Sequence, residues 1–119
     1  MSNKAVVIIP SGKISIQDVD GWKGIKAHLN NAYIELISFG NFNAYVDEDG
    51  IAKELPPNLT ATQIVKKMLA DVGRCLLPGD YIKGTIVFIG QKQSDNPEDG
   101  WIEDDLPQEI INKYFQEFI

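Results

Sequence analysis

Two short apolar segments limit most strongly what this chain can fold into. They are residues 32–39 (AYIELISF) and 85–90 (TIVFIG), which leave little room for polar alternation. Runs of this length, bounded by turn residues, are typical of strands that are buried on both faces of a sheet. A sheet with two such strands needs a layer of structure on each side. We therefore expect a sheet that is covered above and below.

Further strands are predicted on either side of these two. Residues 4–10 (KAVVIIP) form a β-branched apolar run that stops at a Pro-Ser-Gly turn, and residues 13–19 (KISIQDV) complete a hairpin with it. Residues 42–46 (FNAYV) alternate apolar and polar side chains, which is the pattern of a strand with one solvent-facing side. The last strand extends back to Ile82, and Gly84 within it indicates a bulge or a close backbone approach.

The first helix is predicted between these strands. Trp22, Ile25 and Leu29 fall on one helical face, and Asp20 precedes them as a capping residue. The pair Asn30-Asn31 then ends the helix, because asparagine tolerates left-handed backbone better than most residues.

Two more helices follow in the second half of the chain. Residues 60–72 have an apolar face, with Thr60 as the predicted N-cap and Gln63 completing a capping box. Residues 106–118 form a final amphipathic helix after a polar link.

These elements predict an α+β domain with a largely antiparallel sheet and two or three helices, in the order β-β-α-β-β-β-α-β-α. With 119 residues, the chain is long enough for one core without disulfides or a metal. We place the α+β core domain at residues 1–92, followed by an acidic linker and a C-terminal amphipathic helix at residues 93–119.

The excess negative charge lies in the C-terminal segment. Residues 1–94 contain ten Lys/Arg and nine Asp/Glu, a balance of +1, whereas residues 95–119 contain one lysine and eight carboxylates, a balance of −7. The nearly neutral body lacks the basic stripe that duplex-binding proteins use to neutralise phosphates. We therefore expect no direct nucleic-acid binding.

The acidic triplet at residues 47–49 raises the question of a metal site. An EF-type calcium loop that began at Asp47 would need oxygen ligands at its fifth and twelfth positions and glycine at its sixth. The residues at these three positions are Ile51, Ala52 and Asn58. Asp49-Gly50 is instead a strong signal for a tight hairpin turn, with residues 51–55 (IAKEL) as the returning strand. We expect no metal site here.

Catalytic groups are scarce in the sequence. His28 is the only histidine, and its place near the end of a helix suits a structural role. Cys75 is the only cysteine, which excludes an internal disulfide, fits a reducing cytoplasm, and is expected to be a buried small hydrophobe. Phosphate-binding glycine loops and the G-x-S-x-G elbow are absent. The apolar run at residues 5–10 is too short for a membrane span. We expect a cytoplasmic protein that is not an enzyme and uses no cofactor.

One cluster of residues indicates ligand binding. Asn58, Thr60 and Thr62 surround a helix start, where free backbone N–H groups and the helix dipole favour anions. Arg74 and Lys83 would add positive charge. The alternative is that Asn58 and Thr60 only cap and turn the chain.

Four segments, taken in order, resemble domain of unknown function 3846, a small family found largely in phages and mobile elements. They are a helix leading into YIEL (33–36), then YVDEDG (45–50), LPPNLTAT (55–62) and GDYIKGTIVFIG (79–90). The similarity covers about residues 4–90, and Asn30-Asn31 stands where a glycine pair is expected. The resemblance implies a phage or mobile-element origin and a small accessory protein, and it brings no established activity.

Two functions follow as hypotheses. The first is a non-catalytic, phage-type counter-defence protein that sequesters a small anionic ligand such as a nucleotide immune signal. The second is an inhibitor that binds a host protein through the acidic C-terminal segment, by mimicking DNA or docking onto a basic partner, with Trp101 and Phe118 as anchors. An uncharacterised structural or interaction domain is the remaining alternative.

Self-association is also predicted, because one short helix and one medium helix cover a sheet of this size only in part. The C-terminal helix is expected to contribute to a homodimer or a higher homo-oligomer. The expected interface residues are Ile111, Tyr114, Phe115 and Phe118.

Overall fold

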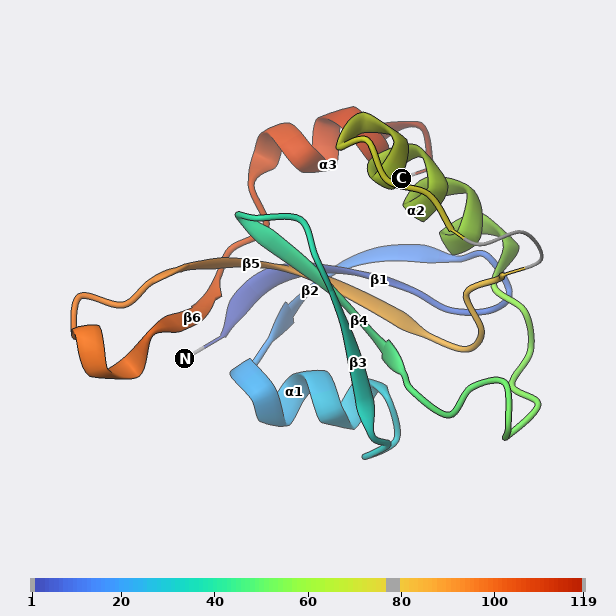
Figure 1. Ribbon diagram of the computed structural model, residues 1–119, viewed down its shortest axis with the longest axis horizontal. Helices are drawn as coiled ribbons and strands as arrows, with labels where there is room; N and C mark the ends of the chain where they lie inside the picture. Colours follow the sequence, from blue (N-terminus) through green and yellow to red (C-terminus); the bar gives the residue numbers. More distant parts are fainter. Residues whose placement is uncertain (1, 77–79, 119) are drawn as a thin grey trace.

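Six strands in the described part of the chain form one antiparallel sheet with helices on both faces (Figure 1). The computed structural model describes residues 2–76 and 80–118. Its elements are β1 (Asn3–Ile8), β2 (Ile14–Val19), α1 (Gly21–His28), β3 (Ile34–Ser38), β4 (Phe42–Asp47), α2 (Leu59–Asp71), β5 (Ile86–Gln93), the 3-10 turn η1 (Pro97–Asp99), β6 (Trp101–Asp104), α3 (Gln108–Tyr114) and the 3-10 turn η2 (Gln116–Phe118). The predicted α+β class and the antiparallel sheet are confirmed.

Strand β5 lies at the centre of this sheet. The strand order is β2-β1-β5-β4-β3, and β6 pairs with the C-terminal half of β5. The first half of β5 pairs with β1 and β4, from Ile86 to Gly90. Its second half continues past the other strands, from Gly90 to Gln93, and only β6 accompanies it there. The predicted burial of residues 85–90 on both faces is confirmed, because Ile86–Gly90 are all buried.

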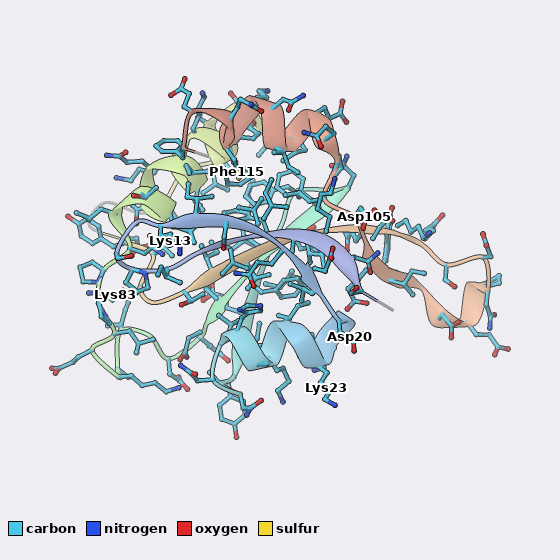
Figure 2. All side chains as sticks on the ribbon, turned by 180° about the vertical axis from the view of Figure 1, so that it is seen from behind. Lys13, Asp20, Lys23, Lys83, Asp105 and Phe115 are labelled. Atoms are coloured by element: carbon cyan, nitrogen blue, oxygen red, sulfur yellow. The ribbon has the colours of Figure 1, made fainter. Side chains whose placement is uncertain are left out.

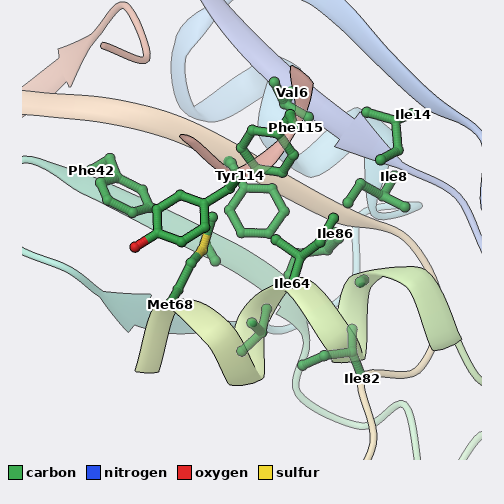
Figure 3. Packing of buried hydrophobic residues seen from close by; sticks show 14 of the residues in the cluster. Val6, Ile8, Ile14, Phe42, Ile64, Met68, Ile82, Ile86, Tyr114 and Phe115 are labelled. Atoms are coloured by element: carbon green, nitrogen blue, oxygen red, sulfur yellow. The ribbon is translucent and has the colours of Figure 1, made fainter. Parts of the chain in front are cut away.

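The larger core lies between the sheet and the helices α2 and α3 (Figure 3). It combines alternate residues of β1, β4 and β5 with Ile64 and Met68 of α2 and Phe115 after α3. The rings of Phe88 and Phe115 lie 5.0 Å apart. A smaller core lies on the opposite face, where Ile25 of α1 and Leu29 at its C-cap pack on the sheet. The expected layers above and below the sheet are therefore present.

The predicted roles of two neighbouring strands are exchanged in the structure. Residues 32–39 were expected to be buried on both faces, but β3 is an edge strand in which Glu35, Leu36 and Ser38 are exposed. Residues 42–46 were expected to have one wet face, but they are buried throughout β4. A strand's burial depends on which strands flank it, and the local pattern does not encode its neighbours.

The expected strand at residues 51–55 is absent. These residues form consecutive turns instead, with hydrogen bonds from Lys53 N to Asp49 O (2.9 Å) and from Leu55 N to Gly50 O (3.0 Å). The turn at Asp49-Gly50 exists, but it does not close a hairpin. The sixth strand is β6, within the segment predicted to be a linker.

The predicted C-terminal end of α1 agrees with the structure, and Asp20 occupies its N-cap position without a side-chain capping hydrogen bond, whereas the predicted N-cap of α2 differs. Asn30 and Asn31 both have left-handed backbone, with φ angles of 55° and 57°, as expected after α1. Helix α2 is capped by Asn58 and not by Thr60, because the Asn58 side chain accepts the hydrogen bond from Ala61 N.

The C-terminal helix packs on its own sheet. Ile111, Tyr114 and Phe115 are all buried in the larger core, and Phe115 is 0% exposed. These three side chains are therefore unavailable to a second protomer, which corrects the predicted interface, and of the four predicted residues Phe118 alone is exposed. The boundary predicted between residues 92 and 93 falls inside β5.

Candidate functional site

Asn58, the first residue of the predicted anion site, is buried and forms its hydrogen bonds within the fold. It is 0% exposed. Its Nδ2 donates to the carbonyl oxygens of Ile8 and Gly84, both at 3.0 Å, and its Oδ1 accepts from Ala61 N at 3.1 Å. Every polar atom of this side chain thus has a partner within the chain, which supports the capping alternative.

The other predicted anion-site residues divide into two groups. Thr62 is buried, and its hydroxyl donates to Asn58 O at 2.8 Å and accepts from Ile82 N at 2.9 Å. Lys83 lies near this helix start through its bridge to Pro57 (Figure 2). Arg74 follows the opposite end of α2, which has 13 residues and is therefore about 20 Å long. The structure brings Arg74 to β3, where its Nη1 donates to Ser38 O at 3.1 Å.

Thr60 sits beside the first hairpin. Its half-buried hydroxyl oxygen lies 2.9 Å from the position that a Cβ atom on Gly12 would take. Gly12 has a φ angle of 94°, so glycine is required there both by the backbone and by Thr60. Thr60 therefore packs against the turn between β1 and β2.

The acidic triplet is organised by hydrogen bonds and an ion pair. Asp47 Oδ1 accepts from Asp49 N at 2.8 Å, and Asp47 Oδ2 pairs with Lys53 Nζ at 2.9 Å. Across the described residues, no group of three or more His, Cys, Asp or Glu side chains is arranged to hold a metal ion.

His28 and Cys75 lie in different surroundings. His28 lines a cavity of about 300 Å³ together with Asn30 and Lys53. Cys75 is exposed, so its predicted role as a buried hydrophobe is wrong. The apolar residues that follow Cys75 suggested burial, and Leu76 does pack against the larger core, but the Cys75 side chain is exposed to solvent.

A second cavity, of about 200 Å³, lies between α2 and α3. Lys67 and Lys113 line it, and their Nζ atoms lie 5.9 and 5.3 Å from the centre of the Tyr114 ring. The Tyr114 hydroxyl donates to Asp71, and this hydrogen bond, with Lys113 nearby, holds the pKa of the Asp71 carboxyl below its ordinary value. The recess is partly apolar and of mixed charge, because Glu117 also lines it and Lys113 pairs with Asp71 at 3.3 Å, which leaves Lys67 as its cation without a carboxylate pair among the described contacts.

The segment predicted as an acidic linker is an ordered hairpin arm. We define the acidic arm as residues 91–105, which pair Gln91–Gln93 of β5 with β6 and turn through η1. It projects beyond the other strands at the left of Figure 1. At its tip, Ser94 N donates to Gly100 O at 2.8 Å, and Asn96 Oδ1 accepts from Glu98 N at 3.1 Å. The arm is therefore a folded structure and not a flexible link.

The acidic arm carries most of the net charge of the protein. It contains six carboxylates and one lysine, a balance of −5, against −6 for the whole chain. Four of the carboxylates are exposed, and those of Glu103 and Asp104 are half-buried. Trp101 is 59% exposed on the same arm. The charge and this tryptophan are evident in the sequence, whereas the strand was not predicted, because its only local signal is the short Trp-Ile pair after Gly100.

The arm is attached to the body at two places. On β1, Lys4 N donates to Asp105 Oδ1 at 2.7 Å, and Leu106 N donates to Lys4 O at 2.8 Å (Figure 2). The hydrogen bond from Lys4 lowers the pKa of the Asp105 carboxyl. On β5, Gly90 lets the backbone of Asp105 lie directly against the strand, because a Cβ atom at residue 90 would lie 2.2 Å from the carbonyl oxygen of Asp105.

An amide network joins the root of the arm to β4. Gln91 Nε2 donates to Gly40 O at 2.6 Å, and Asn43 Nδ2 donates to Gln91 Oε1 at 2.7 Å and to the Tyr45 hydroxyl at 3.3 Å. Burial raises the pKa of Tyr45, so its hydroxyl stays neutral at physiological pH. These hydrogen bonds join the root of the arm to the β3–β4 turn and to β4.

A scan against protein-family models, a search of curated proteins and a search of solved structures each found no match for this chain. The resemblance to domain of unknown function 3846 therefore stays a prediction. Among the described helices, none has the length and apolar character that crossing a membrane requires.

Proposed function

We propose that the protein is a non-catalytic accessory protein that binds a basic partner protein through the acidic arm. The observation that carries this proposal is the separation of charge. Residues 91–105 hold a balance of −5 on a projecting hairpin, and the rest of the chain holds −1. A localised field of this kind steers association with a surface of opposite sign and gives specificity for it.

The folded state of the arm favours tight binding. Its carboxylates are held on a hairpin that is attached through Asp105 and Gln91, so they need little ordering when a partner arrives. Less conformational entropy is then lost on association. Trp101 offers an exposed aromatic anchor, the residue type most common among binding hot spots.

The biological setting is part of the same proposal. The resemblance to a phage and mobile-element family suggests a host protein as the partner, and a surface that normally binds DNA has the required positive charge. Cys75 is exposed and has no disulfide partner in the chain, which fits the reducing cytoplasm.

The experiment uses an oligoarginine peptide as the basic probe. In a Trp22→Phe background, Trp101 is the single tryptophan and reports binding by its fluorescence. We expect saturable binding that weakens as salt is raised, because exposed charges are screened. Neutralising the arm with Asp95→Asn, Glu98→Gln and Asp99→Asn should weaken it strongly.

The control neutralises three exposed carboxylates on the body by Asp18→Asn, Glu48→Gln and Glu54→Gln. It changes net charge by the same amount and should leave most of the binding intact. The same two triple variants then serve as baits in host lysate. Equal binding of peptide and host proteins by both variants would mean that net charge and not the arm is responsible, and the proposal would be rejected.

The cavity between α2 and α3 favours a second candidate function, the sequestration of a small anionic ligand such as a nucleotide. Lys67 and Lys113 would contact the anion and Tyr114 its apolar part. Isothermal titration against cyclic and ADP-ribose-type nucleotides tests this candidate. Heat that disappears in Lys67→Ala, Lys113→Ala supports it, and no heat at concentrations above about 10 µM contradicts it.

A further inference from the structure

The outer edge of β3 presents backbone groups that no other described strand pairs, although one of them, Ser38 O, accepts a hydrogen bond from Arg74 Nη1 at 3.1 Å. Two hydrogen bonds between β3 and β4 show which β3 residues point their backbone groups toward β4. Glu48 N donates to Tyr33 O at 2.8 Å, and Phe39 N donates to Phe42 O at 3.0 Å. In an antiparallel pair, the residues that bond to the neighbouring strand alternate with residues whose N–H and C=O groups point away from it.

It follows that Glu35 and Ile37 bond to β4, while the N–H and C=O groups of Ile34, Leu36 and Ser38 point outward. No other described strand pairs with them, since β3 ends the sheet order. A free edge of this kind is a template for another strand.

The side chains of β3 do little to prevent such pairing. Edge strands are commonly protected by charged residues, prolines or bulges. Each edge strand has one charged residue, Asp18 on β2 and Glu35 on β3, but β2 also has the polar residues Ser15 and Gln17. Leu36 is 52% exposed, and its cross-strand partner Tyr45 contacts the half-exposed Trp22 ring, which adds aromatic surface on the same face.

We propose that β3 pairs with β3 of a second copy of this chain, in an antiparallel dimer whose two-fold axis passes through Leu36. In this register, each Leu36 exchanges both backbone hydrogen bonds with its symmetry mate. Ile34 then lies opposite Ser38, and Glu35 lies opposite Ile37, so no like charges face each other. The two sheets become one continuous sheet of twice the number of strands.

Charge complementarity supports a second copy of this chain as the partner of β3. The Arg74 guanidinium is held at the Ser38 end of β3 by its hydrogen bond to Ser38 O. A two-fold axis perpendicular to the sheet keeps the α2 faces of both copies on the same side. Arg74 of one copy therefore comes next to the Ile34 end of the other copy, where Glu35 lies on that same face. The dimer gains two symmetric Arg74–Glu35 pairs. This proposal uses no residue of the acidic arm, whose strand β6 pairs with β5 and not with β3.

The first test is the mass in solution by sedimentation or light scattering. We expect the intact protein at tens of micromolar to give twice the 13.3 kDa of one chain. Leu36→Lys places two ammonium groups at the two-fold axis and should give the monomer mass. The matched control is Ile16→Lys on β2, where the side chain is 44% exposed on the other edge, and it should remain dimeric.

A charge exchange tests the partner residues directly. Arg74→Glu and Glu35→Arg should each weaken the dimer, because like charges then face each other across the interface. The double variant restores opposite charges and should recover the dimer. Failure of the double variant to recover while both single variants dissociate would overturn the proposed register.

Amide hydrogen exchange on the intact protein needs no variant and therefore does not depend on a variant folding correctly. The amides of Glu35 and Ile37 should be protected at every concentration. Those of Ile34, Leu36 and Ser38 should gain protection only as the concentration rises into the dimer range. A monomeric mass at 100 µM or above (roughly the weak limit of a useful dimer), or protection gained on β2 in place of β3, overturns the proposal.

Discussion

Asn58 shows at the scale of one residue how a single buried side chain joins three parts of the fold. It satisfies carbonyl oxygens in β1 and in the segment before β5, and it caps α2. Asn58→Ala leaves these groups buried without partners and should lower the free energy of unfolding by about 2–4 kcal/mol. Thr60→Ala, at the position that sequence analysis predicted as the cap, should cost about 0.5 kcal/mol. Urea denaturation of the two variants checks the assignment.

Asn58→Asp separates the two roles of this side chain. Aspartate keeps the acceptor for Ala61 N but places a carboxylate against two carbonyl oxygens. It should therefore be at least as destabilising as alanine at neutral pH and less so in acid, where the protonated carboxyl can donate one hydrogen bond. A variant as stable as the intact protein at pH 7 would show that the cap alone matters.

Gly90 matters at the scale of elements, because it is where the acidic arm and the entry to α3 cross β5. In Gly90→Ala, the new Cβ would lie 2.2 Å from the backbone oxygen of Asp105, so the chain must move. We expect a loss of about 1–3 kcal/mol, as for other overpacked sites, and weaker amide protection in β6. The control is Gly50→Ala, whose Cβ would lie 3.3 Å from the Lys83 Cβ, and it should cost less.

The attachment of the arm to β1 should depend on pH. The hydrogen bond from Lys4 N lowers the pKa of Asp105 from its ordinary value of 3.8. A carboxyl with a lower pKa in the folded state stabilises the fold above its unfolded pKa, and this contribution is lost as pH falls through the folded pKa. Asp105→Asn keeps an acceptor without charge, so its melting temperature should lie below that of the intact protein at pH 7. The difference should shrink as pH falls below about 4.

At the scale of the whole molecule, α3 and β6 are parts of the same folding unit as the rest of the chain. Truncation after Gln93 removes Leu106, Ile111 and Phe115 from the larger core, and the truncated chain should show no cooperative unfolding. Phe115→Ala should cost about 3–5 kcal/mol, whereas Phe118→Ala, at a side chain that is 47% exposed, should change stability by about 0.5 kcal/mol or less. A stable, cooperative fragment 1–93 would contradict this view.

The corrected position of α3 also changes how self-association has to be tested. A charged substitution at Phe115 would unfold the protomer and could not report on an interface. The exposed edge at β3 is suited to that test, because Leu36 can be replaced without removing a residue from the core.

The sequence by itself determined the local structure: the apolar runs that form β1 and β5, the left-handed Asn30-Asn31 pair after α1, and the concentration of charge near the C-terminus. These features depend on residues close together in the chain, so a local pattern encodes them. The tertiary structure alone decided that β3 and not β4 is the edge, that Asn58 is fully used inside the fold, and that the acidic segment is an ordered arm. Each of these depends on hydrogen bonds or burial between residues far apart in sequence, and the pairing partner, not the local pattern, sets whether a side chain is exposed.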